Sequence, residues 1–125
     1  RRVGSLLYFS GVISISSDGT EWLGQVGAER SFEDGYEAAR VCALNVLATL
    51  KDITGSLDSI AQIVYLGGYV NAVPGYGKSP SVVNGASDLF EALYGEPGKH
   101  ARAAVADSGL PKNATVEIQV IIELR

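Results

Sequence analysis

Two ionisable residues stand inside apolar stretches near the end of the chain. Arg102 lies near the start of the apolar run Ala101–Ala106, and Glu117 lies within the run Thr115–Leu124. Burying an unpaired charge is costly, so a charged side chain in such a setting usually has a partner or a ligand. The planar fork of an arginine suits a carboxylate, and a glutamate beside a pocket can hold and polarise a water. The two residues are therefore candidates for a small-carboxylate site; alternatively, both point into solvent or pair with each other.

The other groups of residues that could carry chemistry give weaker signals. Residues 72–79 (AVPGYGKS) fit a relaxed phosphate-loop pattern, but Pro80 removes a backbone donor directly after the serine. A glycine-rich turn before a helix is the simpler interpretation. One histidine, His100, and one cysteine, Cys42, cannot supply a usual zinc site, so no metal site is expected. A serine nucleophile would need a nearby base; His100 is interpreted as a solvated loop residue and Cys42 as a small core residue.

Composition restricts the class of protein. A chain of 125 residues with 46% hydrophobic and 19% charged residues is expected to form one globular domain over residues 1–125. Its net charge of −4 provides no broad positive field for nucleic-acid phosphates, so nucleic acid is disfavoured as a partner. A single cysteine fits a reducing compartment, and no apolar run reaches the roughly 18 residues that span a bilayer. Without a signal-peptide pattern, a cytoplasmic location is expected.

The pattern of apolar and β-branched residues predicts five strands. They are expected over Leu6–Ile15, Glu21–Leu23, Ile60–Val70, Ala101–Ala106 and Thr115–Leu124. The pair Gly67-Gly68 inside the third of these marks a bulge or a close approach of the backbone to a neighbour.

Two helices are predicted between these strands. The first runs over Phe32–Ile53, where apolar residues recur at helical spacing after Ser31, an N-cap with an acidic residue three positions on. The second has Ser79 as its N-cap, with Pro80 at the first helical position, and ends before Gly95. The order β-β-α-β-α-β-β predicts an α/β domain with both helices on one face of the sheet.

Two helices leave the other face of the sheet uncovered. Leu7, Val12, Val64 and Ile118 are expected on that face. A monomer would leave this apolar surface in water, so the pattern favours a homo-oligomer packed sheet to sheet.

With these residues in place, the chain resembles the YjgF-like, or Rid (reactive intermediate deaminase), family from Leu7 to Leu124. The resemblance is carried by the segments Ser10-Gly11, Gly35–Ala39, Ala43–Leu47, Ile63–Tyr65, Arg102–Val105, Leu110–Lys112 and Val116–Ile118. Residues 83–89 (VNGASDL) together with 100–102 (HAR) are similar to a less studied branch of that family.

The resemblance implies a chorismate-mutase-like α/β fold, with a mixed sheet and two helices on one face. It also implies a homotrimer, in which the sheets pack inward as a barrel and ligand clefts lie between subunits. The implied activity is an imine/enamine deaminase without cofactor. Its substrates are 2-imino acids such as 2-iminopropanoate and 2-iminobutyrate, which water converts to 2-oxo acids and ammonia.

Carried over residue by residue, the resemblance implies that Arg102 binds the substrate carboxylate and that Glu117 positions the attacking water. Ser10 and Gly11, the serine–glycine pair of the first strand, and Asn84 of the second helix are implied to contact the substrate.

The chain also departs from the family pattern. Ala104 stands where the family often has a cysteine, so its backbone N–H could contact substrate but no thiol is present. Val12 replaces a frequent glutamine, and residues 1–8 offer no counterpart of the cleft tyrosine. These departures favour a second hypothesis, a non-enzymatic trimer that binds a small carboxylate such as a 2-oxo acid. A third, endoribonuclease activity, is disfavoured by the acidic balance and the single histidine.

Overall fold

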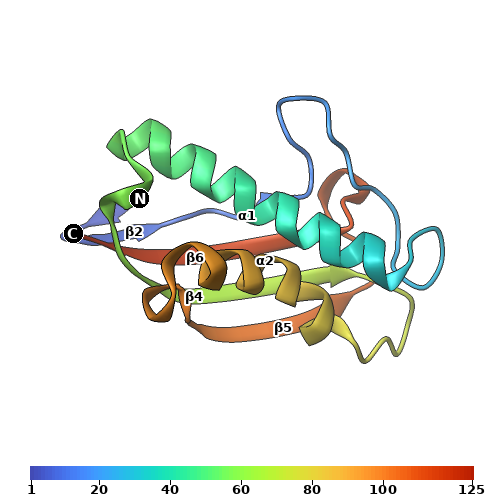
Figure 1. The fold of residues 1–125 in the computed structure, drawn as a ribbon. Coiled ribbons are helices and arrows are strands. Elements are labelled where there is room, and N and C mark those ends of the chain that lie inside the picture. The colour runs from blue at the N-terminus through green and yellow to red at the C-terminus, as the bar shows by residue number, and fades with distance from the viewer.

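Two helices cover one face of a six-stranded sheet in the computed structural model, which describes residues 1–125 (Figure 1). The strands are β1 (Arg2–Val3), β2 (Leu6–Tyr8), β3 (Val12–Ile13), β4 (Ile60–Asn71), β5 (Ala101–Asp107) and β6 (Val116–Leu124). Their order is β1-β2-β6-β4-β5, and β3 also pairs with β6. Only the pairing of β4 with β5 is parallel, so the sheet is mixed, as predicted.

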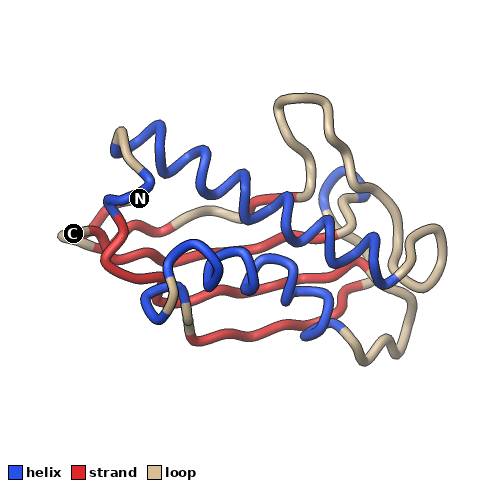
Figure 2. Tube along the Cα trace, viewed as in Figure 1, coloured by secondary structure: helices blue, strands red, loops and turns tan.

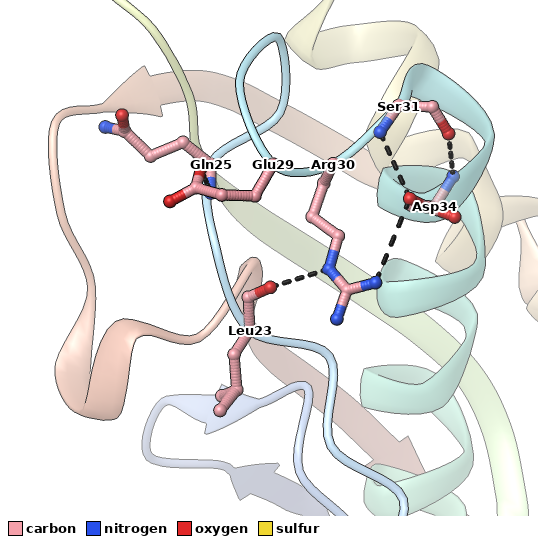
Figure 3. Close-up of polar contacts among 6 residues, drawn as sticks. All are labelled: Leu23, Gln25, Glu29, Arg30, Ser31 and Asp34. Atoms are coloured by element: carbon pink, nitrogen blue, oxygen red, sulfur yellow. Dashed lines mark hydrogen bonds and ion pairs between the residues drawn. The ribbon is translucent and has the colours of Figure 1, made fainter.

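Helix α1 spans Phe32–Thr54 and begins with the predicted capping box. The Ser31 hydroxyl accepts from the Asp34 amide at 3.1 Å, and the Asp34 carboxylate accepts from the Ser31 amide at 3.1 Å (Figure 3). Two contacts of Arg30 hold the preceding loop against α1. Its Nε donates to the Leu23 carbonyl at 2.6 Å, and its Nη1 lies 3.9 Å from the Asp34 carboxylate oxygen Oδ2. This loop, residues 14–31, is the longest connection in the fold (Figure 2).

Helix α2 spans Ser79–Tyr94 and ends before Gly95, as predicted, but its start differs by one residue. The N-cap is Lys78, whose carbonyl accepts from the Val82 amide at 3.1 Å, and no side chain caps the helix. Ser79 was expected to be the cap; instead it is the first helical residue and is buried. The three remaining short elements are 3₁₀ turns at Leu57–Ser59, Glu96–Gly98 and Pro111–Asn113.

The first predicted strand is divided in two. Tyr8 of β2 pairs with Ile121 of β6, and Val12 of β3 pairs with Ile118 of the same strand. The chain thus takes four residues from Tyr8 to Val12, opposite only three residues of β6. The extra residue interrupts the ladder, so a single strand over Leu6–Ile15 is wrong. The predicted strand at Glu21–Leu23 is also wrong, since this segment forms only isolated bridges.

The buried face of the sheet differs from the prediction. Leu7 and Ile118 were expected on the uncovered face, but they are 4% and 0% exposed and face the helices. Val12 packs partly buried against the same core. Val64 alone of the four is exposed, at 36%, beside an irregularity in the ladder between Ile63 and Tyr65. For the first and last strands, the residues predicted on the uncovered face therefore lie on the face that the helices cover.

Gly68 lies where α2 crosses the sheet. A Cβ at this position would overlap the side chain of Val83, so the predicted close approach is confirmed. The bulge predicted at Gly67-Gly68 is not found there, because both register shifts in β4 lie before Tyr65. None of the helices is long and apolar enough to cross a membrane.

Candidate functional site

Arg102 projects from β5 toward α2, on the face of the sheet that the helices cover. Its Nη1 donates to the Asn84 side-chain oxygen at 2.8 Å and to the Ser87 hydroxyl at 3.1 Å. Nε and Nη2 form no hydrogen bond, and no carboxylate lies within 4 Å of the guanidinium. Nη1 is thus held in place, while Nε and Nη2 are free to donate to the two oxygens of a carboxylate.

A polar hollow of about 250 Å³ opens beside this guanidinium. Its lining contains no hydrophobic residue and consists of Asn84, Ser87, Asp88, Glu91, Lys99, His100 and Arg102. The α2 residues of this set recur at helical spacing, so they share one face of the helix. Gly85 faces the other way, where a Cβ would collide with the Tyr36 carbonyl of α1. Close contact with α1 therefore fixes which face α2 presents to β5.

His100 is part of this hollow rather than a solvated loop residue, so that interpretation is wrong. Its Nδ1 lies 2.9 Å from the Gly98 carbonyl, and its Nε2 lies 2.9 Å from the Ser87 hydroxyl. A carbonyl only accepts, so the proton is assigned to Nδ1, and Nε2 accepts from Ser87. Burial lowers the pKa of His100, and the charge of Arg102 lowers it further, against the raising effect of the Gly98 hydrogen bond. The imidazole is consequently neutral at neutral pH.

Five residues of the hollow were not named as site residues from the sequence: Ser87, Asp88, Glu91, Lys99 and His100. Of these, Ser87 and His100 are joined to Arg102 by hydrogen bonds. Each carried a weak signal. Ser87 follows Asn84 by three positions on a predicted helix, which places both on one face. His100 precedes Arg102 by two positions in extended backbone, which projects both side chains to the same side of the sheet.

Glu117 lies on the opposite face of the sheet from Arg102. Its neighbours Val116 and Ile118 are fully buried under the helices, so the intervening side chain points to the uncovered face. There its carboxylate lies against Gly11, where a Cβ would collide with it. No ion pair joins Arg102 to Glu117, so the alternative that they pair with each other within one subunit is wrong.

The remaining expected contact residues lie in different parts of the subunit. Asn84 binds Arg102 directly, and Ala104 lies on the same side of β5, half-buried and paired with Gly68. Gly11 lies against the Glu117 carboxylate, whereas Ser10 is exposed and borders a hollow of about 170 Å³ that Thr49 and Ile53 of α1 also line. The residues expected to contact a substrate therefore do not come together within one subunit.

The other residues considered from sequence have structural roles. Cys42 is fully buried, its Sγ lies 3.4 Å from the Val116 carbonyl, and burial raises the pKa of its thiol above the usual range. It is a core residue, as predicted. Residues 72–78 form a turn containing Gly75 at φ +78° that leads into α2, in agreement with the simpler interpretation of the phosphate-loop pattern. No three histidine, cysteine, aspartate or glutamate side chains converge in the structure.

Comparison with known proteins places this geometry in a family. A protein of unknown function from Agrobacterium tumefaciens, Atu1372, is 40% identical with a TM-score of 0.95, over 100% of this chain and 81% of that one. Protein TCP17 of Trypanosoma cruzi is 38% identical over 97% of this chain and 76% of its own length. RidA from an Antarctic Psychrobacter species is 26% identical with a TM-score of 0.66, over 99% of this chain and 85% of that one. The profile described as "YjgF/chorismate_mutase-like, putative endoribonuclease" matches residues 1–124, and the chain belongs to this YjgF/RidA family.

Proposed function

We propose that this protein is an imine/enamine deaminase that hydrolyses small 2-imino acids, such as 2-iminopropanoate and 2-iminobutyrate, to 2-oxo acids and ammonia. The observation that carries the proposal is that only one nitrogen of the Arg102 guanidinium forms hydrogen bonds within the subunit. Its Nη1 is held by Asn84 and Ser87, Nε and Nη2 form no hydrogen bond, and the residue lines a polar hollow. That is the arrangement a substrate carboxylate needs for a two-point contact.

Glu117 is proposed to contribute from a neighbouring subunit. It lies on the uncovered face of β6 and cannot meet Arg102 of its own chain, because the sheet separates them. The uncovered face also carries Val105, which is 48% exposed, and the half-buried rings of Tyr65 and Tyr69. Burying this apolar surface supports the homotrimer implied by the resemblance.

In the assembled site, Arg102 of one subunit would hold the carboxylate and so fix the adjacent C=N carbon. The Glu117 carboxylate of the other subunit would orient a water toward that carbon, with Ser10 and Gly11 beside it. Water adds, the carbon–nitrogen bond breaks, and ammonia leaves to give the 2-oxo acid. Holding the two reactants in this orientation would raise the rate of water addition.

The test is ammonia release from freshly generated 2-iminobutyrate. Wild-type protein should accelerate it, and Arg102→Ala should reduce the rate to that of buffer. Arg40→Ala removes an exposed arginine of α1 and is the matched control, which should keep the wild-type rate. A wild-type rate no faster than buffer would refute the proposal.

A second candidate function is carboxylate binding without turnover. The specific observation behind it is Ala104, which provides no reactive group beside Arg102. Calorimetry with 2-oxobutyrate separates the candidates, since binding without imine hydrolysis favours the second one. The family description also names an endoribonuclease. The net charge of −4 argues against RNA as a substrate, and cleavage of RNA that is lost in Arg102→Ala would reverse this ranking.

A further inference from the structure

We propose that His100, acting through Ser87, is the acid–base group of the Arg102 hollow: it takes up the proton of the attacking water and returns it to the departing nitrogen. The reaction rests on the proposed function, whereas the relay itself is built from residues of one subunit. Glu117 would then orient the water without carrying its proton.

The hydrogen bonds of the relay run in a defined direction. The Gly98 carbonyl can only accept, which leaves Nε2 of His100 as an acceptor at 2.9 Å from the Ser87 hydroxyl. Ser87 therefore donates to His100 and accepts from Arg102 Nη1 at 3.1 Å. Its second lone pair remains available to the hollow. A molecule held by Arg102 can thus pass a proton to Ser87 while Ser87 passes its own to His100.

No other group of the hollow is as well suited to proton transfer. The charged groups around His100 are Asp88 and Glu91 of α2, Lys99 beside it in the chain, and Arg102 of β5. Asp88 accepts from the Tyr36 hydroxyl at 2.7 Å. Lys99 lies 3.9 Å from Glu91 and is hydrogen-bonded to Glu96, which raises its pKa further from neutrality. Only His100 is neutral and bonded, through Ser87, to the residue that would hold the substrate.

The ring of His100 is also fixed in position. Phe90, a fully buried residue of α2, meets it edge-on with ring centroids 6.3 Å apart. Together with the bonds to Ser87 and Gly98, this contact defines the plane and tautomer of the imidazole. Geometry is the first requirement of a general base, which must lie within hydrogen-bond reach of the proton it takes up, directly or through one intervening group.

The proton steps balance as follows. Water attacks the carbon of the protonated C=N group, and its proton moves to Ser87 Oγ as the Ser87 proton moves to His100 Nε2. The products are a neutral carbinolamine and an imidazolium. His100 returns the proton through Ser87 to the amino nitrogen, the C–N bond breaks, and ammonia leaves with the bonding electron pair. The hydroxyl proton is released as the C=O bond forms, and it leaves with ammonia as ammonium.

The chain contains one histidine, so all imidazole signals in nuclear magnetic resonance come from His100. In the full-length protein we expect the Nδ1–H tautomer, and we expect 2-oxobutyrate to raise the pKa of His100 because its carboxylate stabilises the imidazolium. Ser87→Ala should diminish this response. In the imine assay, Ser87→Ala and His100→Gln should each lower kcat by about 10²-fold or more, as for the loss of an acid–base group. Both should also remove the fall in kcat at low pH, and Arg40→Ala should match wild type.

The outcomes separate the two proposals. If wild type hydrolyses the imine and His100→Gln keeps its kcat and pH profile while binding 2-oxobutyrate normally, the relay is refuted and the deaminase stands. If wild type has no imine activity but 2-oxobutyrate raises the pKa of His100 through Ser87, the deaminase is refuted and the relay stands as proton-coupled carboxylate binding. If the opposite tautomer is found, or if bound 2-oxobutyrate leaves the pKa of His100 unchanged, the relay is refuted whatever the activity.

Discussion

Arg102 and Glu117 point to opposite faces of the same sheet. Arg102 pairs with Leu66 of β4, and Glu117 pairs with Tyr69 of the same strand. The two residues therefore lie three positions apart along β4, with their side chains on opposite sides of the sheet. A site that uses both residues must therefore combine two copies of the chain. In the proposed mechanism, the hollow beside Arg102 transfers the proton and the opposite face orients the water.

The first prediction tests whether the site is shared between subunits. Arg102→Ala and Glu117→Gln should each be inactive alone, but co-expression of the two variants should restore activity. In a trimer of randomly mixed subunits, roughly one quarter of the interfaces would join an intact arginine to an intact glutamate. The measurement is imine turnover of the co-purified mixture, with separately purified variants as the control. A mixture as inactive as its components would mean that the two residues do not meet across an interface.

The second prediction concerns the carboxylate clamp. A ligand that binds only the folded assembly stabilises it by RT ln(1 + [L]/Kd), about 2.7 kcal/mol at a hundredfold excess over Kd. We expect 2-oxobutyrate to raise the thermal midpoint of wild type and to suppress dissociation on dilution. Arg102→Lys keeps the charge but loses the fork, so its midpoint should respond much less. An equal response in both proteins would show that the fork is not the clamp.

The third prediction concerns Gly11, which leaves room for the Glu117 carboxylate. Its φ is not positive, so alanine fits the backbone, but the added Cβ must displace that carboxylate. Gly11→Ala should therefore lower imine turnover while leaving 2-oxobutyrate affinity, measured by calorimetry, near the wild-type value. Gly109→Ala adds a Cβ in open space and is the matched control. Loss of affinity in Gly11→Ala alone would instead tie Gly11 to the carboxylate half-site.

The fourth prediction concerns the contact that orients α2. At Gly85 a Cβ would meet the Tyr36 carbonyl, and backbone cannot move aside as a flexible side chain can. Gly85→Ala should lower the free energy of unfolding by about 1–3 kcal/mol, the usual cost of overpacking. Gly77→Ala, whose Cβ would enter open space, should change it much less. Urea titration of both variants provides the measurement; equal stabilities would show that the helices separate easily at this point.

Local patterns predicted the helices and central strands because their signals lie within a few residues. Ser31 and the acidic residue after it begin α1 as expected, and Ile60–Val70 forms most of β4. The faces of the first and last strands could not be assigned, because the bulge near Gly11 depends on pairing with a strand about a hundred residues away. The same limit applies to the site. Arg102 and Asn84 were named from sequence, but the link from Ser87 to His100 depends on how α2 crosses β5.

The last prediction follows from the burial of His100. Burial lowers its pKa in the folded protein, whereas in the unfolded chain the pKa stays near 6.5, so the unfolded state binds the proton more tightly. The stability contributed by the neutral imidazole is therefore complete above pH 6.5 and is lost as pH falls toward the folded-state pKa. We expect the free energy of unfolding to decrease between pH 7 and pH 5 in wild type. His100→Gln, which cannot titrate, should decrease less over this interval, before the carboxyl groups begin to bind protons. Urea unfolding at several pH values measures both curves, and parallel curves would mean that His100 is not buried as a neutral base.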